Sequence, residues 1–226
     1  MEPRFVPVAD HALLVEFTPE LRDQANRAVV ALDQALNSTT IIGLREIVPA
    51  FVNLLVDFDP LVTDHSAVEE SVKSLLSADR SQAAMPRRHR ALVCYEEPVA
   101  PDLAAVATAC GISIDAVIDA HLAGDYRVFM YGFAPGYAYL GGVPTGIQVP
   151  RKLTPVRDVA AGSILIAGPQ CLISTLRMPT GWSIIGRSTT EVLRHDEAKH
   201  FLFDIGDTVE FERIDLATYE RLSGDR

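Results

Sequence analysis

Glycine and aromatic residues alternate in the stretch from Tyr126 to Gly142, where a strand-like start leads into a loop. Glycine lets a backbone approach a ligand closely, and its N–H group can bind an anion or a developing oxyanion. Aromatic faces can enclose a flat amide or a ring. The alternative is a tightly packed structural turn, in which geometry requires glycine and the aromatic side chains fill the core. On the functional interpretation, the substrate-binding candidates are Tyr131, Gly132, Phe133, Pro135, Gly136, Tyr137, Tyr139, Gly141 and Gly142.

Three arginines and one histidine are the other candidates for chemistry. Arg127, Arg151 and Arg187 each lie in apolar or Gly/Pro-rich sequence, where an unpaired guanidinium would be costly. Each needs an acidic side chain or a carboxylate or phosphate ligand. Arg151 follows Pro150, which restrains the backbone and can help to aim the guanidinium at a carboxylate. His121 lies on the apolar side of an expected helix, where histidine is more often a hydrogen-bonded core residue. We take His121, Arg127 and Arg151 as catalytic candidates and Arg187 as a substrate-binding candidate.

Several common signatures are missing from the sequence. It contains neither GxxxxGK[ST] nor GxGxxG, so the chain has no recognisable ATP cradle of its own. It also lacks GxSxG, which argues against a self-contained serine hydrolase. The three cysteines are widely spaced and form no CxxC pair, so we expect neither disulfides nor a bound metal.

Charge and hydropathy narrow the partners and the compartment. The formal net charge of -10 argues against nucleic acid and anionic membrane surfaces as partners. No apolar stretch near the start has the length of a signal peptide or a membrane span, so we expect a cytoplasmic protein.

The first third of the chain alternates strand and helix patterns. Residues 11–17, 41–47 and 51–58 have the period of strands. Thr18 is expected to cap a helix after the first strand, and Asp64 or Ser66 to start a second helix after the last. This order predicts a small α+β domain over residues 1–80.

The stretch from Ser77 to Arg90 has no periodicity and predicts a solvated joint between domains. The second domain, residues 89–226, opens with a strand at 91–95, and two helices follow. Between Tyr131 and Trp182 lie eight of the 14 glycines and six of the 14 prolines, which suits a barrel or folded sheet with functional loops. We expect the loop 131–142 and the segment around Arg151 to wall one cavity, with His121 and Arg127 near it.

Long motifs of the chain resemble those of a known family. Tyr126 to Gly142 resembles the signature YRVYMLGFxPGFxYLGG, and residues 161–168 resemble PAGSVAIAG. Residues 181–187 resemble GWxIIGRT, and residues 206–211 resemble GDxVxF. By these motifs the chain is identified as a member of the family that joins allophanate hydrolase subunit 1 and the B-type subunit of 5-oxoprolinase, with the carboxyltransferase domain and Kip inhibitor-like proteins. The resemblance covers nearly the whole chain and implies an α+β fold: a ferredoxin-like N-terminal domain followed by a cyclophilin-like β-barrel that carries the site.

The resemblance also implies a function. Its first choice is the B-type subunit of a heteromeric ATP-dependent amide or lactam hydrolase, which cleaves C–N amide bonds only with its partner. The implied partners are a second cyclophilin-like subunit (C-type, or subunit 2) and a lactam-utilisation A-type subunit, with ATP used by the assembled complex and a small amide as substrate. One alternative is a biotin-dependent carboxyltransferase half-site, with biotin carried by a partner. Another is a non-catalytic inhibitor of a histidine kinase.

Two segments depart from the family pattern. The usual PRxxxPR is replaced in residues 150–157, where the second arginine is displaced to Arg157. The usual NQTGIYPxxSPGGW is altered in residues 169–182, where Thr180 replaces a glycine. The resemblance places this second segment at the cavity, so the substrate is expected to differ from that of typical members.

Overall fold

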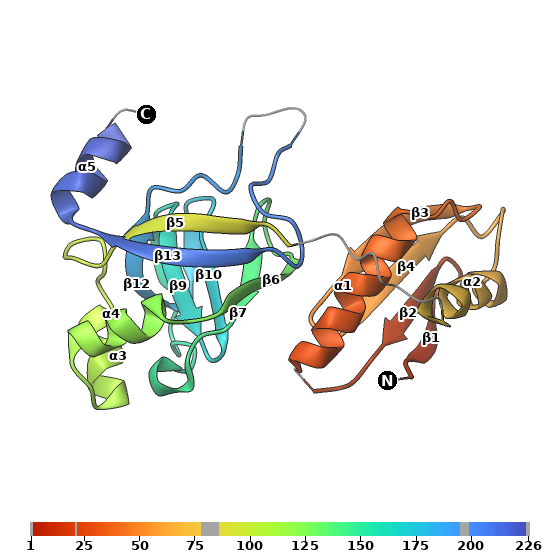
Figure 1. Ribbon diagram of the computed structural model, residues 1–226, viewed down its shortest axis with the longest axis horizontal. Helices are drawn as coiled ribbons and strands as arrows, with labels where there is room; N and C mark the ends of the chain where they lie inside the picture. Colours follow the sequence, from red (N-terminus) through yellow and green to blue (C-terminus); the bar gives the residue numbers. More distant parts are fainter. Residues whose placement is uncertain (1, 21, 78–85, 195–198, 225–226) are drawn as a thin grey trace. The chain divides into compact units, whose positions relative to one another are not determined.

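The computed structural model describes residues 2–20, 22–77, 86–194 and 199–224 (Figure 1). The chain divides into two compact units, Met1–Met85 and Pro86–Arg226. Most of the expected joint falls on residues 78–85, which lie outside the described residues.

The N-terminal unit is a four-stranded antiparallel sheet with two helices. Its elements are β1 (Arg4–Val8), β2 (Ala12–Glu16), α1 (Asp23–Asn37), β3 (Leu44–Pro49), β4 (Asn53–Phe58) and α2 (His65–Ser77), with the strand order β1-β2-β4-β3. Both helices pack on the sheet, α1 against β3 and β4 and α2 against β2. The core forms because β2 and β4 bury alternate residues, among them Val15, Val56 and Phe58.

Two details of this unit differ from the sequence prediction. Strand β1 was not expected, because its Pro7 lowers the strand propensity, yet an edge strand tolerates proline. Helix α1 begins at Asp23, and no side chain caps it, whereas Thr18 was expected to do so. The Thr18 hydroxyl instead accepts a hydrogen bond from the Glu20 N–H at 3.3 Å, within the preceding loop.

The C-terminal unit is built on a closed seven-stranded barrel. Its strands are β5 (Arg88–Cys94), β6 (Tyr126–Tyr131), β7 (Ala138–Gly141), β9 (Ser163–Ala167), β10 (Gln170–Ile173), β12 (Ser183–Ser188) and β13 (Thr208–Ile214), in the order β10-β7-β6-β13-β5-β12-β9. Outside the barrel are α3 (Leu103–Cys110), α4 (Ile114–Leu122), the 3-10 turn η1 (Thr145–Ile147), α5 (Leu216–Gly224) and the separate strand pair β8 (Val156–Val159) and β11 (Met178–Thr180). The described chain is thus a mixed α/β protein with a closed barrel.

Part of the barrel wall buries side chains on both faces. In β7, Leu140 joins the interior core, whereas Tyr139 packs in a second cluster on the outer face. The same alternation places Cys171 of β10 inside and its neighbour Leu172 outside. The outer cluster consists of Tyr137, Val159, Leu165, Ala167, Leu172, Trp182 and Ile184, with Ala134, Tyr139 and Met178 packed partly against it.

The C-terminal unit also corrects two sequence predictions. Strand β5 begins at Arg88, so Arg88 and Arg90 belong to the barrel and not to a solvated joint. The parallel partner β13 supplies the backbone hydrogen bonds that a local pattern cannot reveal. The chain after residue 126 was expected to be strand and loop throughout, but it ends in helix α5.

Candidate functional site

Arg151 lies on the aromatic outer face of the barrel. Its guanidinium carbon is 5.5 Å from the centre of the Trp182 ring, a cation–π distance. The Trp182 ring in turn meets the Tyr139 ring edge-on at 5.9 Å. Burial raises the pKa of Tyr139, and the nearby charge of Arg151 opposes that rise. Arg151 is exposed, and within the described residues its side chain forms no ion pair, so its charge is available to an anion.

Lys152 fixes the segment that carries Arg151. Its backbone N–H donates to the Gly181 carbonyl at 2.7 Å. Its ammonium group pairs with the Asp102 carboxylate at 2.5 Å, and the same carboxylate oxygen accepts the Ile184 N–H at 2.7 Å. The pair is only about one-fifth exposed and joins the segment to the residue before α3 and to β12. The position of Arg151 is therefore set from both sides.

The aromatic loop closes on its own hydrogen bonds. The Ala134 N–H donates to the Gly132 carbonyl at 2.9 Å, across a Phe133 whose φ is +71°, the geometry of a γ-turn. The Tyr137 N–H then donates to the Ala134 carbonyl at 3.1 Å, around Pro135 and a Gly136 with φ +72°. The N–H groups of 132, 134 and 137 are thus used inside the loop. The expectation that the loop glycines offer free donors to an oxyanion is not met at Gly132.

Gly141 and Gly142 serve packing. A Cβ atom at Gly141 would lie 2.2 Å from the ring of Phe129, and one at Gly142 would lie 2.1 Å from the carbonyl oxygen of Asp125. Gly142 also has a φ of +113°, which side chains with a Cβ rarely adopt. The structural alternative therefore describes these two positions, because protein atoms already occupy the space that a ligand would need.

Tyr131 also belongs to the protein's own packing. Its hydroxyl donates to the Phe203 carbonyl at 2.7 Å, and its ring stacks on Phe201 at 5.2 Å. Burial raises the pKa of Tyr137 to about 12, so this phenol is neutral at physiological pH. Of the predicted loop residues, Tyr139 is the one that contacts the Trp182 ring.

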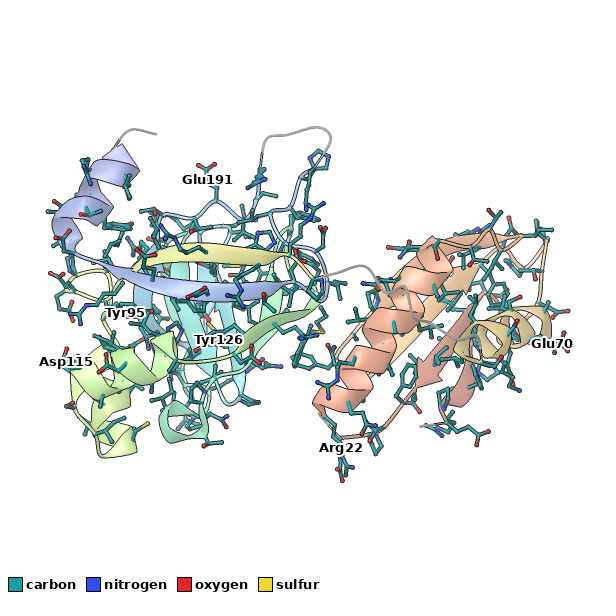
Figure 2. All side chains as sticks on the ribbon, viewed as in Figure 1. Arg22, Glu70, Tyr95, Asp115, Tyr126 and Glu191 are labelled. Atoms are coloured by element: carbon teal, nitrogen blue, oxygen red, sulfur yellow. The ribbon has the colours of Figure 1, made fainter. Side chains whose placement is uncertain are left out.

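His121 lies inside the barrel unit and is fully buried. Its Nδ1 atom is 2.8 Å from the Tyr95 hydroxyl, and its Nε2 atom is 3.6 Å from the sulfur of Cys171. Burial lowers the pKa of His121 to about 3 and raises that of the Cys171 thiol, so both are neutral. Figure 2 shows Tyr95 and Tyr126 in the same region, where α4 approaches β13.

The structure therefore does not place His121 in one cavity with the loop and Arg151. His121 contacts inward-facing residues, and Tyr139 and Trp182 lie in the cluster on the other face of the wall. The prediction went wrong because the spacing along the chain from His121 to β6 is short, yet the alternation within β7 and β10 separates the two faces.

Arg127 and Arg187 lie apart from the outer cluster. Arg127 is half-buried on β6, opposite Gly141 and Thr208. Arg187 is half-buried on β12, opposite Cys94 and Ser163, and its Nε atom is buried without a hydrogen-bond partner. Neither side chain forms an ion pair with any residue that the structure describes. Their predicted catalytic and substrate-binding roles stay predictions.

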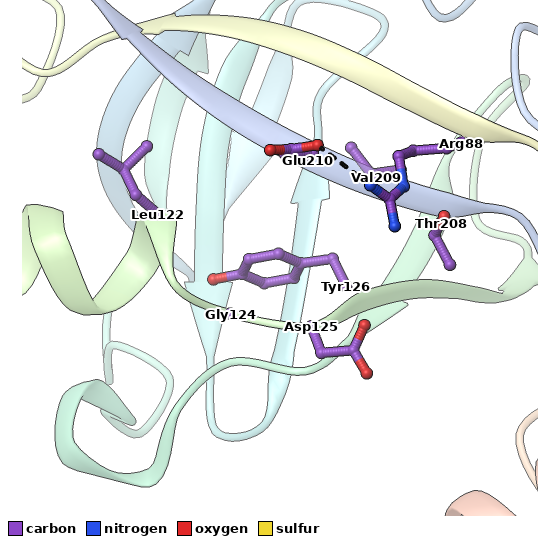
Figure 3. A pocket seen from close by; sticks show the side chains of 8 residues that line it. All are labelled: Arg88, Leu122, Gly124, Asp125, Tyr126, Thr208, Val209 and Glu210. Atoms are coloured by element: carbon purple, nitrogen blue, oxygen red, sulfur yellow. Dashed lines mark ion pairs between the residues drawn. The ribbon is translucent and has the colours of Figure 1, made fainter.

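A pocket of about 280 Å³ opens elsewhere on the barrel, between the start of β6 and β13 (Figure 3). The Arg88 and Glu210 side chains form an ion pair of 4.0 Å at its edge. The Tyr126 hydroxyl is buried there without a hydrogen-bond partner, and burial raises the pKa of that phenol. The pocket is lined by Arg88, Leu122, Gly124, Asp125, Tyr126, Thr208, Val209 and Glu210. None of these was a predicted site residue, so this pocket and the Arg151 face are different places.

The Arg151 face also differs from the rest of the chain in charge. Residues 126–190 contain six basic residues and one acidic residue, although the whole chain has a net charge of -10. Asp158, the single acidic residue, pairs with Arg177 at 3.1 Å. Positive charge and aromatic surface thus coincide around Trp182, a residue that sequence reasoning quoted in a motif but did not assign to the site.

Metal and membrane sites are also outside what the described residues offer. No group of three or more His, Cys, Asp or Glu side chains is arranged there to hold a metal ion. No single helix within the described ranges has the length and hydropathy to cross a membrane. The bent pair α3 and α4 meets the criteria of length and composition together.

Comparisons with known sequences identify relatives along nearly the whole chain. Residues 3–203 match the family described as carboxyltransferase domain, subdomain C and D. The chain is 33% identical to the 5-oxoprolinase B subunit of Bacillus subtilis, over 94% of this chain and 93% of that protein. It is 31% identical to the Haemophilus influenzae protein of the same name, over 93% of this chain and 99% of that protein.

Comparisons with solved structures agree. The crystal structure of TTHA0988 is 31% identical with a TM-score of 0.81, over 91% of this chain and 40% of that one, so this chain spans about two-fifths of that protein. PH0987 from Pyrococcus horikoshii is 34% identical with a TM-score of 0.57, over 96% of this chain and 100% of that chain. The urea amidolyase of K. lactis, 15% identical with a TM-score of 0.78 over 99% of this chain and 15% of that chain, shares the fold. The resemblance found in the sequence motifs is confirmed, and the chain belongs to the family of the carboxyltransferase domain, subdomain C and D.

Proposed function

We propose that the chain is the B-type subunit of a heteromeric ATP-dependent amide hydrolase, with 5-oxoproline or a similar small lactam as substrate. The observation that carries the proposal is the match to proteins named as B subunits of 5-oxoprolinase, which extends over more than nine-tenths of both chains. An allophanate hydrolase subunit 1-like activity is the same proposal with an open-chain amide.

In this proposal the substrate lies on the Arg151 face. The exposed guanidinium binds the carboxylate of 5-oxoproline, and the Trp182 and Tyr139 rings contact the flat lactam. Asp102 and Lys152 hold the segment in place. His121 has no contact with substrate and instead holds Tyr95 and Cys171 together in the core.

ATP and the bond-breaking step belong to the assembled complex. ATP would activate the amide oxygen, and hydrolysis of the C–N bond would follow. The chain has no phosphate-binding motif, so we assign the ATP site to the partners, a C-type cyclophilin-like subunit and a lactam-utilisation A-type subunit. We place this assembly in the cytoplasm.

The two units fit the folds that the family resemblance implies. The sheet order β1-β2-β4-β3, all antiparallel, is the order of a ferredoxin-like sheet whose last strand has moved to the start of the chain. The closed barrel with α3 and α4 packed on it is the counterpart of a cyclophilin-like domain.

The test is reconstitution. The chain is co-purified with the C-type and A-type subunits encoded beside it, and ATP hydrolysis is measured with 5-oxoproline, with allophanate and without substrate. We expect ATP hydrolysis that depends on one of the two amides and on all subunits. A complex that forms but hydrolyses neither amide would rule the proposal out.

A carboxyltransferase half-site is the second candidate, because the matching family is described as a carboxyltransferase domain. In that case a partner would carry biotin, and the complex would transfer a carboxyl group from carboxybiotin to the substrate. Transfer of labelled bicarbonate to an acceptor, blocked by avidin, distinguishes it from amide hydrolysis.

A further inference from the structure

Four large apolar side chains are exposed around the Arg151 face. Phe133 is 75% exposed and Leu153 is fully exposed, and Val156 and Leu176 are also exposed. We call these four residues the apolar rim. Isolated exposed apolar residues are ordinary, but a contiguous group marks an interaction site.

The rim residues are connected through one strip of chain, residues 175–181. The Thr175 hydroxyl donates to the Pro135 carbonyl at 2.7 Å, which brings the Phe133 loop beside Leu176. Val156 of β8 lies opposite Thr180 of β11. Leu153 follows Lys152, which is bonded to Gly181. The rim is therefore one surface and not four separate side chains.

Phe133 is held outward by a strained backbone. Its φ of +71° at the centre of a γ-turn is unusual for a residue with a Cβ atom and costs of the order of 1–3 kcal/mol. The side chain gains little in return from burial, since its ring contacts Tyr137 at 5.6 Å and is otherwise exposed. A fixed, exposed aromatic ring loses little entropy when a partner covers it, which is the property of an interface anchor.

The charges beside the rim indicate the partner's surface. Arg151, Arg157 and Arg177 are exposed there, and only Asp158 opposes them. A protein surface that complements this one has an apolar socket for Phe133 and an acidic border.

We propose that the apolar rim is the docking surface for a second, acidic-bordered polypeptide, namely the C-type subunit of the proposed complex. This inference rests on the proposed function, which requires that subunit. It also agrees with TTHA0988, in which the counterpart of this chain is 40% of a longer polypeptide. Docking there would cover the Arg151 face and enclose a substrate between the two proteins.

The test measures binding of the purified C-type subunit to the purified chain by calorimetry, without substrate. Phe133→Asn removes the ring but keeps a residue that tolerates positive φ, so the loop is not strained further. We expect Phe133→Asn to weaken binding by roughly 30-fold or more, the usual loss for an interface anchor, and Phe133→Tyr to bind almost as the wild type does. Arg157→Glu should also weaken binding, and more so at low salt.

Leu61→Ser is the matched control, because Leu61 is equally exposed, at 94%, but belongs to the N-terminal unit. Its affinity should stay within about twofold of the wild type, the scale of a residue outside an interface. Equal binding by Phe133→Asn and the wild type would overturn the rim while leaving the complex in place. A wild-type chain that does not bind the C-type subunit at all would overturn the proposed function as well. Phe133-dependent dimers of the chain alone would identify a second copy as the occupant and overturn the choice of partner.

Discussion

Arg151 and its aromatic support explain why one arginine among six basic residues in this region is singled out. Several neighbours are already committed: Lys152 pairs with Asp102, and Arg177 with Asp158. Arg151 instead lies against the ring of Trp182, the single tryptophan of the chain. A guanidinium over an aromatic face keeps its hydrogen-bond donors free for a carboxylate.

Arg151→Ala should lower the kcat/KM of the assembled enzyme for 5-oxoproline by about 10- to 100-fold, the range for losing a charged hydrogen bond. Arg151→Lys should recover only part of it, because the bidentate geometry is lost. With 2-pyrrolidone, a lactam without a carboxylate, any activity should be the same for the variant and the wild type. Arg157→Ala is the control for loss of a nearby positive charge. Unchanged 5-oxoproline kinetics, or unfolding of the Arg151→Ala barrel, would mean that Arg151 has a structural role.

His121 should make the stability of the barrel depend on pH. Its pKa is about 3 in the folded chain, because of burial, against about 6.5 unfolded. Between these values the unfolded chain binds the extra proton, so acidification favours unfolding. We expect the unfolding free energy of the barrel to fall by roughly 2 kcal/mol more between pH 7 and pH 5 in the wild type than in His121→Gln.

Trp182 provides the measurement, because its fluorescence in denaturant titrations reports on the barrel unit alone. His11→Gln, an exposed position in the N-terminal unit, is the matched control and should leave the pH profile of Trp182 unchanged. Parallel profiles for the wild type and His121→Gln would show that His121 is protonated as easily in the folded barrel as outside it.

At the scale of elements, β6 and β7 are joined by a tight approach of two backbones. Gly142 ends β7 where the Asp125 carbonyl, just before β6, leaves no space for a side chain. This approach holds the loop between the two strands, and with it Tyr139 and Phe133. The glycines of the signature thus position the site without touching a ligand.

Gly142→Ala should destabilise the barrel by about 3 kcal/mol or more, because it adds a clash to a positive φ. Gly146→Ala is the control, since a Cβ atom there meets nothing within 4 Å. Its effect should stay below about 1 kcal/mol. Thermal unfolding followed by Trp182 fluorescence compares the two, and equal melting temperatures would refute the assigned role of Gly142.

At the scale of the whole molecule, the charge is divided unevenly along the chain. Residues 126–190 are basic while the chain is acidic overall, and the basic stretch coincides with the Arg151 face and the apolar rim. A single chain therefore presents an open, charged and partly apolar surface. Such a surface suits an assembly better than a finished active site.

The purified chain should accordingly show no 5-oxoproline-dependent ATP hydrolysis above the background of a buffer control. The physical reason is that no phosphate-binding loop is present and that Arg151 remains in contact with water. A coupled phosphate-release assay on the single chain, and then on the reconstituted complex, makes the comparison. Substantial turnover by the single chain would refute the need for a partner.

The sequence by itself determined the family and most of the elements. The motifs around Tyr126–Gly142 and Trp182 are long, and the strand period in β2 and β4 and the glycine after α3 are local signals that need no partner. Edge strand β1, the early start of β5 and the helix α5 escaped prediction, because pairing with distant segments or packing on them decides those elements.

Only the tertiary structure decided which candidate residues share a surface. His121 and Tyr139 both lie in segments rich in apolar residues, and nothing in their spacing separates them. The barrel does so, because successive side chains of β7 and β10 point to opposite faces: His121 meets Cys171 inside, while Tyr139 meets Trp182 outside. Gly142 likewise looked like a ligand contact until Asp125, a residue 17 positions away, was seen to fill its space. Contacts between distant segments depend on how the strands close into a barrel, and local sequence does not encode that closure.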